Sequence, residues 1–284
     1  MSLTKHLLTI TPQSLHRATT HSFLQHAGQG TLSKKHLTRW LTQDRLYAQS
    51  YIRFIGLLLS KIDLSSSPSS FSTTSTTDRA VGILSDALVN IRCELGFFAA
   101  VAEEYDLKLD SLSEDNENRD EKEKDVSVAQ PGTDTNPNPA SHTQTDKSGK
   151  NNDTDNTDND QGYITHAYIN LFMSAGSAGV SLLEGLVVLW ATEMCYLRAW
   201  RYAASFLTEK ERQREEEDAD GGALRNRFIP NWTNPEFERF VEEIGDLVDA
   251  MADEQGEENG EMRARCERWW KQVLWLEERF WPTI

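Results

Sequence analysis

The sequence predicts an all-α fold, a single multi-helix bundle that carries a long acidic insertion. Apolar residues recur every three or four positions over several long segments, which is the period of an α-helix. No run of alternating apolar and polar residues lies between turn signals, so no strand is predicted. The chain has no internal repeat, and long amphipathic helices must bury their apolar stripes against each other. We therefore expect residues 1–284 to form one helical domain.

The helical period places the expected helices in order along the chain. Thr31, followed by Lys34 and Lys35, opens the second of them, and Asn234 caps the sixth with Pro235 in its first turn. The seven expected helices cover residues 12–27, 34–62, 79–105, 163–175, 179–207, 235–253 and 261–281.

Two segments interrupt this helical pattern. Residues 64–78 are rich in serine and threonine ("SSSPSSFSTTSTT") and read as a linker loop. Residues 110–162 are rich in Asn, Asp, Thr, Ser and Pro. Such a composition buries too little apolar surface to offset the entropy of ordering. We expect a disordered acidic insertion within the domain, because helical segments continue on both sides of it.

Charge and composition exclude several classes of protein. The net charge of −16 disfavours a nucleic-acid partner and an anionic membrane surface, both of which need a basic face. Three widely spaced cysteines indicate neither a disulfide framework nor a zinc site. The N-terminus has too short an apolar run for a secretory signal, and no apolar run is long enough to span a membrane. We expect a soluble cytoplasmic protein.

A carboxylate interrupts the apolar stripe of the second expected helix. Leu37, Tyr51 and Leu58 lie seven residues apart on one face, and the position that completes the run is Asp44. An unpaired carboxylate on a core-facing stripe is expensive, so Asp44 must have a partner or a function.

Carboxylates lie on the apolar stripes of three other expected helices: Glu94, Glu193 and Glu277. One interpretation pairs each with an arginine or a tyrosine hydroxyl inside the bundle. The other gathers them in a polar pocket within an apolar shell, as helical bundles commonly do.

Metal and cofactor signals are weak, and we predict no cofactor. The chain contains no Glu-x-x-His motif, which a di-iron bundle site would need twice. His16, His21 and His26 leave haem binding as a third possibility, although surface or packing roles fit them better. Cys93 and Cys266 are expected in the core, and no Gly-x-Ser-x-Gly nucleophile motif occurs.

Four motifs in order resemble the TenA/thiaminase II family of the haem-oxygenase-like fold. They are "HSFLQHAGQGTLSKKHLTRWLTQDRLYAQSY", "LLEGLVVLWATEMCYLRAW", "IPNWTNPEFERF" and "LEERFW". Together they span nearly the whole chain outside its two interruptions. The resemblance implies that the fold is haem-oxygenase-like and that the ligand is an aminopyrimidine-type heterocycle.

The resemblance also implies roles for individual residues. Asp44 would hydrogen-bond the aminopyrimidine ring, Glu277 would be the general acid/base, and three tyrosines would line the pocket: Tyr47, Tyr168 and Tyr196. The position of the family's cysteine nucleophile is Thr192 here, and we expect Thr192 to bind the substrate at that place in the pocket. Its neighbour Glu193 is then a candidate second catalytic carboxylate, and Cys195 is a weaker candidate for a substitute nucleophile.

These observations predict a TenA-like protein that binds an aminopyrimidine-type ligand and hydrolyses or deaminates it for thiamin salvage. The alternative is a non-catalytic, small-molecule-binding or regulatory protein that kept the fold and lost the nucleophile. By resemblance, and from its Trp-rich C-terminal helix, the chain is also expected to form a homo-oligomer.

Overall fold

The computed structural model describes residues 1–64, 75–109, 154–207, 218–256 and 260–284, and every regular element within these ranges is helical. The predicted all-α fold is confirmed. The elements are α1 (Leu3–Ile10), α2 (Pro12–Thr19), α3 (Ser22–Gly28), α4 (Lys34–Leu59), α5 (Thr76–Glu104), α7 (Thr154–Ala175), α8 (Leu182–Ala204), the π-helix η3 (Leu224–Phe228), α9 (Ile229–Thr233), α10 (Pro235–Glu254) and α11 (Gly260–Phe280).

The helices α4, α5, α8, α10 and α11 follow the predicted ranges to within a few residues, whereas α7 begins nine residues before its predicted start at 163. The expected helix 12–27 is two helices, because the chain breaks at Thr20 and His21, where the His21 Nδ1 atom accepts a hydrogen bond from the Phe23 N–H as the cap of α3. The short helix α1 and the η3–α9 turn were not predicted. Thr31 does not cap α4; that position belongs to Ser33, whose hydroxyl accepts from the His36 N–H.

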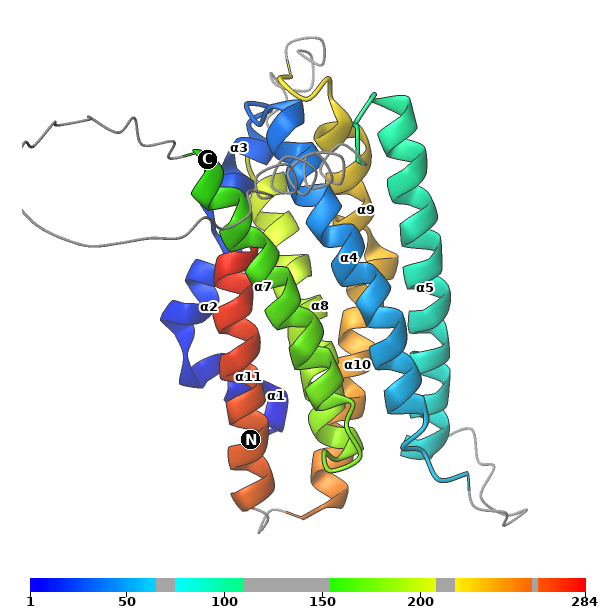
Figure 1. The fold of residues 1–284 in the computed structure, drawn as a ribbon. Coiled ribbons are helices and arrows are strands. Elements are labelled where there is room, and N and C mark those ends of the chain that lie inside the picture. The colour runs from blue at the N-terminus through cyan, green and yellow to red at the C-terminus, as the bar shows by residue number, and fades with distance from the viewer. Residues whose placement is uncertain (65–74, 110–153, 208–217, 257–259) are drawn as a thin grey trace, which may run out of the picture.

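The helix α8 is the centre of the bundle, and α4, α7, α10 and α11 run alongside it (Figure 1). Its N-terminus is fixed by a capping box. The Ser181 hydroxyl accepts a hydrogen bond from the Glu184 N–H, and the Glu184 carboxylate accepts one from the Ser181 N–H. Most of its residues are buried, including consecutive ones from Leu183 to Thr192. A helix that is buried on nearly every side fits the long apolar run of its sequence.

The apolar stripe of α4 faces the core as predicted. Leu37, Tyr51 and Leu58 are buried, and so is Asp44. The helix α5 packs against α4 on the outer side of the bundle. Asp44 therefore lies inside the protein, where water does not solvate its charge.

The two expected interruptions are only partly covered by the described residues. Ser75 caps α5, and Thr76–Asp78 belong to that helix, so the linker predicted at 64–78 extends too far. Residues 154–162, which we expected in the insertion, lie in α7. The rest of that insertion, residues 110–153, lies outside the described residues.

A cluster of aromatic rings fills the upper half of the bundle, around Trp40 of α4. The Trp40 ring lies 5.4 Å from Trp200 and 5.8 Å from Trp232, between ring centroids. The ring centroids of Phe23 and Trp281 lie 5.6 and 6.1 Å from that of Trp40. These rings join α3, α4, α8 and α9 to the residues that follow α11, so the chain ends are tied to the same core.

In the parts of the chain that the structure describes, no helix combines the length and the apolar character needed to cross a bilayer.

The contact between α3 and α8 gives a test of this packing. A Cβ atom at Gly28 would lie 2.0 Å from the Ala203 carbonyl oxygen, which is backbone and cannot move aside. We expect Gly28→Ala to destabilise the protein by about 1–3 kcal/mol through overpacking, measured by urea unfolding. The control is Gly82→Ala within α5, where nothing lies within 4 Å of the new atom. That change should stabilise by about 0.5–1 kcal/mol, and equal effects of the two changes would contradict the packing described.

Candidate functional site

A cavity of about 350 Å³ opens between α4, α5, α8, α9 and the start of α10. Its volume is in the range of small-molecule sites. Aromatic and carboxyl side chains dominate its wall. The lining residues are Asp44, Tyr47, Ala48, Tyr51, Ala87, Asn90, Ile91, Cys93, Glu94, Phe97, Phe98, Glu193, Tyr196, Asn231, Trp232, Asn234, Glu236, Phe237 and Phe240.

Asp44 has one oxygen bound and one free. Its side chain is buried, and Oδ2 accepts a hydrogen bond of 2.8 Å from the Tyr196 hydroxyl of α8. The buried Oδ1 atom has no hydrogen-bond partner among the described residues. Burial, together with the nearby charge of Glu94, raises the pKa of Asp44 well above its ordinary value. An orphaned buried oxygen that belongs to a cavity-lining side chain is suited to bind a donor on a ligand.

Glu193 projects from α8 into the same cavity. The Tyr51 hydroxyl of α4 hydrogen-bonds its carboxylate, and that contact favours the ionised form. Burial outweighs it and raises the pKa of Glu193 to about 8. Glu193 therefore holds a proton at neutral pH and can give it up to a ligand, as a general acid must.

Glu94 adds a third carboxyl group from α5. Its Oε1 atom accepts a hydrogen bond of 2.5 Å from the Trp232 indole N–H of α9. Burial raises the pKa of Glu94 to about 7, so its protonated and ionised forms are nearly balanced at neutral pH. Because Trp232 fixes one oxygen, the orientation of the carboxyl group is set by the protein.

Glu277 is buried but does not line the cavity. It accepts a hydrogen bond from the Tyr168 hydroxyl of α7, and burial raises its pKa to about 8. The Tyr168 ring packs edge-on against Tyr47, with 5.0 Å between centroids, and Tyr47 does line the cavity. Glu277 is thus connected to the cavity wall through two tyrosines. Its charge nevertheless raises the pKa of Tyr47 and of Asp44, which shows that it lies close behind that wall.

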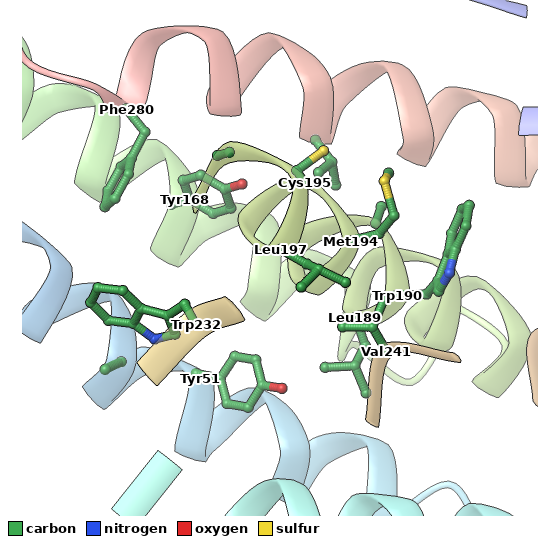
Figure 2. Close-up of a cluster of buried hydrophobic side chains, with 14 of the residues drawn as sticks. Tyr51, Tyr168, Leu189, Trp190, Met194, Cys195, Leu197, Trp232, Val241 and Phe280 are labelled. Atoms are coloured by element: carbon green, nitrogen blue, oxygen red, sulfur yellow. The ribbon is translucent and has the colours of Figure 1, made fainter. Parts of the chain in front are cut away.

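Neither candidate nucleophile of α8 faces the cavity. The Thr192 hydroxyl is buried and donates to the Leu189 carbonyl, 2.9 Å away. Cys195 is fully buried, and burial raises the pKa of its thiol well above the ordinary value. Figure 2 shows Cys195 on the side of α8 that faces α11 and Tyr168, opposite Tyr51 and Trp232. Because a thiol must ionise and reach the substrate to attack it, Cys195 is unsuited to that role.

The other two cysteines, both predicted to lie in the core, differ in their exposure to solvent. Cys266 is buried, as predicted. Cys93 is exposed and lines the cavity, so its prediction as a core residue was wrong. It lies next to Glu94 on α5.

The buried carboxylate Glu184 forms a contrast to these groups. Burial alone would raise its pKa, but hydrogen bonds from Ser181, Trp269 and Arg265 outweigh burial and hold the pKa below its ordinary value. Glu184 is therefore a paired, structural carboxylate. No lysine, arginine or histidine lines the cavity within the described ranges. Those ranges also contain no cluster of three or more His, Cys, Asp or Glu side chains that could hold a metal ion.

The structure brings four of the seven predicted site residues into the cavity wall: Asp44, Tyr47, Glu193 and Tyr196. Tyr168, Thr192 and Glu277 lie outside it. The wall also contains residues that sequence reasoning did not assign to the site. Trp232 and Asn231 belong to a five-residue helix that the helical period cannot reveal, although the two prolines in "IPNWTNP" signal short elements there.

The raised pKa of Glu277 predicts how stability depends on pH. Between about pH 4.5 and 8 the folded protein keeps a proton that the unfolded chain releases. This contribution is complete below pH 4.5 and is lost as the pH rises through 8, at up to about 1.4 kcal/mol per pH unit. We expect Glu277→Gln to lose less free energy of unfolding than wild type between pH 5 and 8, measured by urea unfolding.

Glu184→Gln is the matched control, because the pKa of Glu184 is lowered. Its contribution is complete above about pH 4.5 and is lost as the pH falls below that value, so this variant should be destabilised by about the same amount from pH 5 to 8. The same pH dependence in both variants would refute the assigned protonation states.

Comparisons with known proteins agree with this architecture. The TENA/THI-4/PQQC family model matches residues 9–124, a range that includes Asp44, Tyr47 and Glu94. A TenA homologue from Pyrococcus furiosus has a similar structure, with a TM-score of 0.65 and 19% identity over 98% of both chains. A TenA family transcription regulator from Silicibacter sp. TM1040 has a TM-score of 0.62 and 16% identity over 98% of this chain and 94% of that one.

A curated relative gives a match of greater identity. A "Probable transcription factor" from Fusarium pseudograminearum is 29% identical over 99% of this chain, which spans about half (52%) of that protein's length. The family model matches less than half of the chain, and the likeness to the TenA homologues shows a shared all-α fold.

Proposed function

We propose that the protein binds an aminopyrimidine-type, thiamin-related heterocycle in this cavity and hydrolyses or deaminates it. The observation that carries the proposal is Asp44, whose free Oδ1 atom is buried while Tyr196 holds Oδ2. The family supports a role related to thiamin metabolism. The particular ligand and the reaction are our inference from the chemistry of the cavity.

The cavity complements a flat ring that bears an amine. Oδ1 of Asp44 can accept a hydrogen bond from an exocyclic amine. Because the pKa of Asp44 is raised, its protonated form can also donate to a ring nitrogen. The rings of Tyr47, Tyr196 and Trp232 line the cavity and provide flat apolar walls.

The reaction we propose is hydrolysis of a carbon–nitrogen bond, with no change of oxidation state. The oxygen of water bonds to the carbon while the bond to nitrogen breaks. The departing nitrogen takes a proton from the acid form of Glu193, and the carboxylate that remains accepts a proton from the attacking water. Glu193 lines the cavity and has a pKa of about 8, so it can perform both transfers near neutral pH.

Glu277 acts through Tyr168 and Tyr47 in this proposal. The Tyr168 hydroxyl hydrogen-bonds to Glu277, and the Tyr168 ring supports the Tyr47 ring in the cavity wall. Its predicted role as the general acid/base stays a prediction, and direct contact with the ligand requires Tyr47 to move. In the described arrangement Glu277 is a positioning residue.

The alternative is a non-catalytic protein that binds a small molecule and regulates a partner. It is favoured by Thr192 and Cys195, which leave no nucleophile of α8 at the cavity. Two relatives are also named as transcription proteins, one of them about twice as long as this chain. Turnover separates the two functions, because a regulatory protein would bind the ligand unchanged.

Self-association and location in the cytoplasm stay predictions. The apolar surface that we expected on the C-terminal helix is limited, because Trp270 is buried and Trp275 remains half exposed. An oligomer must therefore use more than this helix.

A turnover assay tests the proposal. Purified protein is incubated with thiamin and with 4-aminopyrimidines that carry an aminomethyl or a formylaminomethyl group, and the products are separated by chromatography. We expect one of them to be hydrolysed by wild type, with turnover at least about 100-fold lower in Glu193→Gln, since general acid–base catalysis contributes about 10²–10⁴-fold. Glu236→Gln, at the exposed rim of the cavity, is the control and should keep wild-type turnover. Binding without any product would favour the regulatory alternative.

A further inference from the structure

We propose that Glu94, held by Trp232, determines specificity by binding a positively charged amino substituent of the ligand. This inference rests on the proposed function, because it concerns the same cavity. It goes beyond that function by adding a residue and a charge preference that neither the motifs nor the proposed reaction uses.

Glu94 comes from a helix that carries neither Asp44 nor the aromatic walls Tyr47, Tyr196 and Trp232. Asp44 and Tyr196 belong to α4 and α8, whereas Glu94 lies on α5 and its partner Trp232 lies on α9. Within the described residues the structure gives Glu94 this single hydrogen bond, to Oε1. The Oε2 atom is therefore available to a ligand, and the carboxyl group is already oriented when the ligand arrives.

The charge of the cavity selects the chemistry of that ligand. Four carboxyl groups line it: Asp44, Glu94, Glu193 and Glu236. No basic side chain lines it in the described part of the chain, and the nearby charges that act on Asp44 all come from carboxylates, those of Glu94, Glu193 and Glu277. A bound cation favours the ionised form of a neighbouring carboxyl group, whereas an anion disfavours it, so this wall suits a cation. A cation would also be attracted to the faces of the aromatic rings.

Glu94 is the carboxyl group best suited to meet the cation. Trp232 holds only its Oε1 atom, whereas Glu193 is held by the Tyr51 hydroxyl and supplies the proton in the proposed reaction. Asp44 is occupied by the Tyr196 hydroxyl and by the ring. The other titratable groups that face the cavity are Tyr47, Tyr51, Cys93, Glu193, Tyr196 and Glu236.

Cys93 gives a direct measure of occupancy. It lines the cavity beside Glu94 and is exposed, whereas Cys195 and Cys266 are buried. Iodoacetamide should therefore label Cys93 first, and a ligand in the cavity should slow that labelling. Mass spectrometry of the labelled protein reports binding even when the ligand is weak.

The experiment uses three probes with wild type, Glu94→Gln and the control Glu103→Gln, an exposed carboxylate on the same helix that does not line the cavity, each checked for folding by thermal unfolding. Two are 4-aminopyrimidines of nearly equal size, one with a protonated aminomethyl group and one with a neutral hydroxymethyl group. The third is benzylamine, a cation that lacks the aminopyrimidine ring. Dissociation constants are obtained at pH 7.5 from how strongly each concentration of probe slows the iodoacetamide labelling of Cys93. Glutamine preserves the shape of residue 94 and the acceptor for Trp232, so a loss reports charge rather than packing.

We expect wild type and Glu103→Gln to bind the aminomethyl probe at least about tenfold more tightly than the hydroxymethyl probe, and Glu94→Gln to bind the two within about twofold. A preference that survives in Glu94→Gln, or that is absent from wild type, overturns the inference. If neither pyrimidine binds but benzylamine binds wild type and not Glu94→Gln, the inference stands and the proposed function fails. If no probe protects Cys93 in wild type, both are wrong.

Discussion

The burial of carboxyl groups without basic partners is the constraint on which the rest of this structure depends. A buried carboxylate is stable only if a cation pairs with it, if hydrogen bonds satisfy it, or if it takes up a proton. Glu184 takes the first two routes, with Arg265 and the cap of α8. Glu193 and Glu277 take the third, with pKa values near 8. The difference separates a structural carboxylate from groups that can move protons.

The hydrogen bond from Tyr196 to Asp44 connects this chemistry to the fold. It joins the centre of α8 to the inner face of α4, two helices that also meet where Trp40 packs against Trp200. Tyrosine hydroxyls perform the same task at Glu193 and Glu277, where Tyr51 and Tyr168 are the donors. A tyrosine fixes the position of a carboxyl group without neutralising it. Such an arrangement keeps the protons of the site exchangeable while the surrounding rings keep the site rigid.

Sequence reasoning found the features that depend on long helical periods. Asp44 and Glu277 interrupt stripes of more than four turns, and both are buried as that pattern predicts. It failed where a short element or a long-range contact decides the outcome. Trp232 lies in a single-turn helix, and its bond to Glu94 joins residues that are 138 positions apart. The expectation that Cys93 lies in the core rested on the usual burial of a free cysteine and failed, because residue type does not fix which face of a helix a side chain occupies.

The structure of the protein bound to a 4-aminopyrimidine tests the central claim most directly. The account predicts that the exocyclic amine donates to Oδ1 of Asp44 while Tyr196 still donates to Oδ2, and that the ring lies between the aromatic walls of the cavity. A ligand bound elsewhere, or one that occupies the cavity and leaves Oδ1 of Asp44 without a partner, would contradict it.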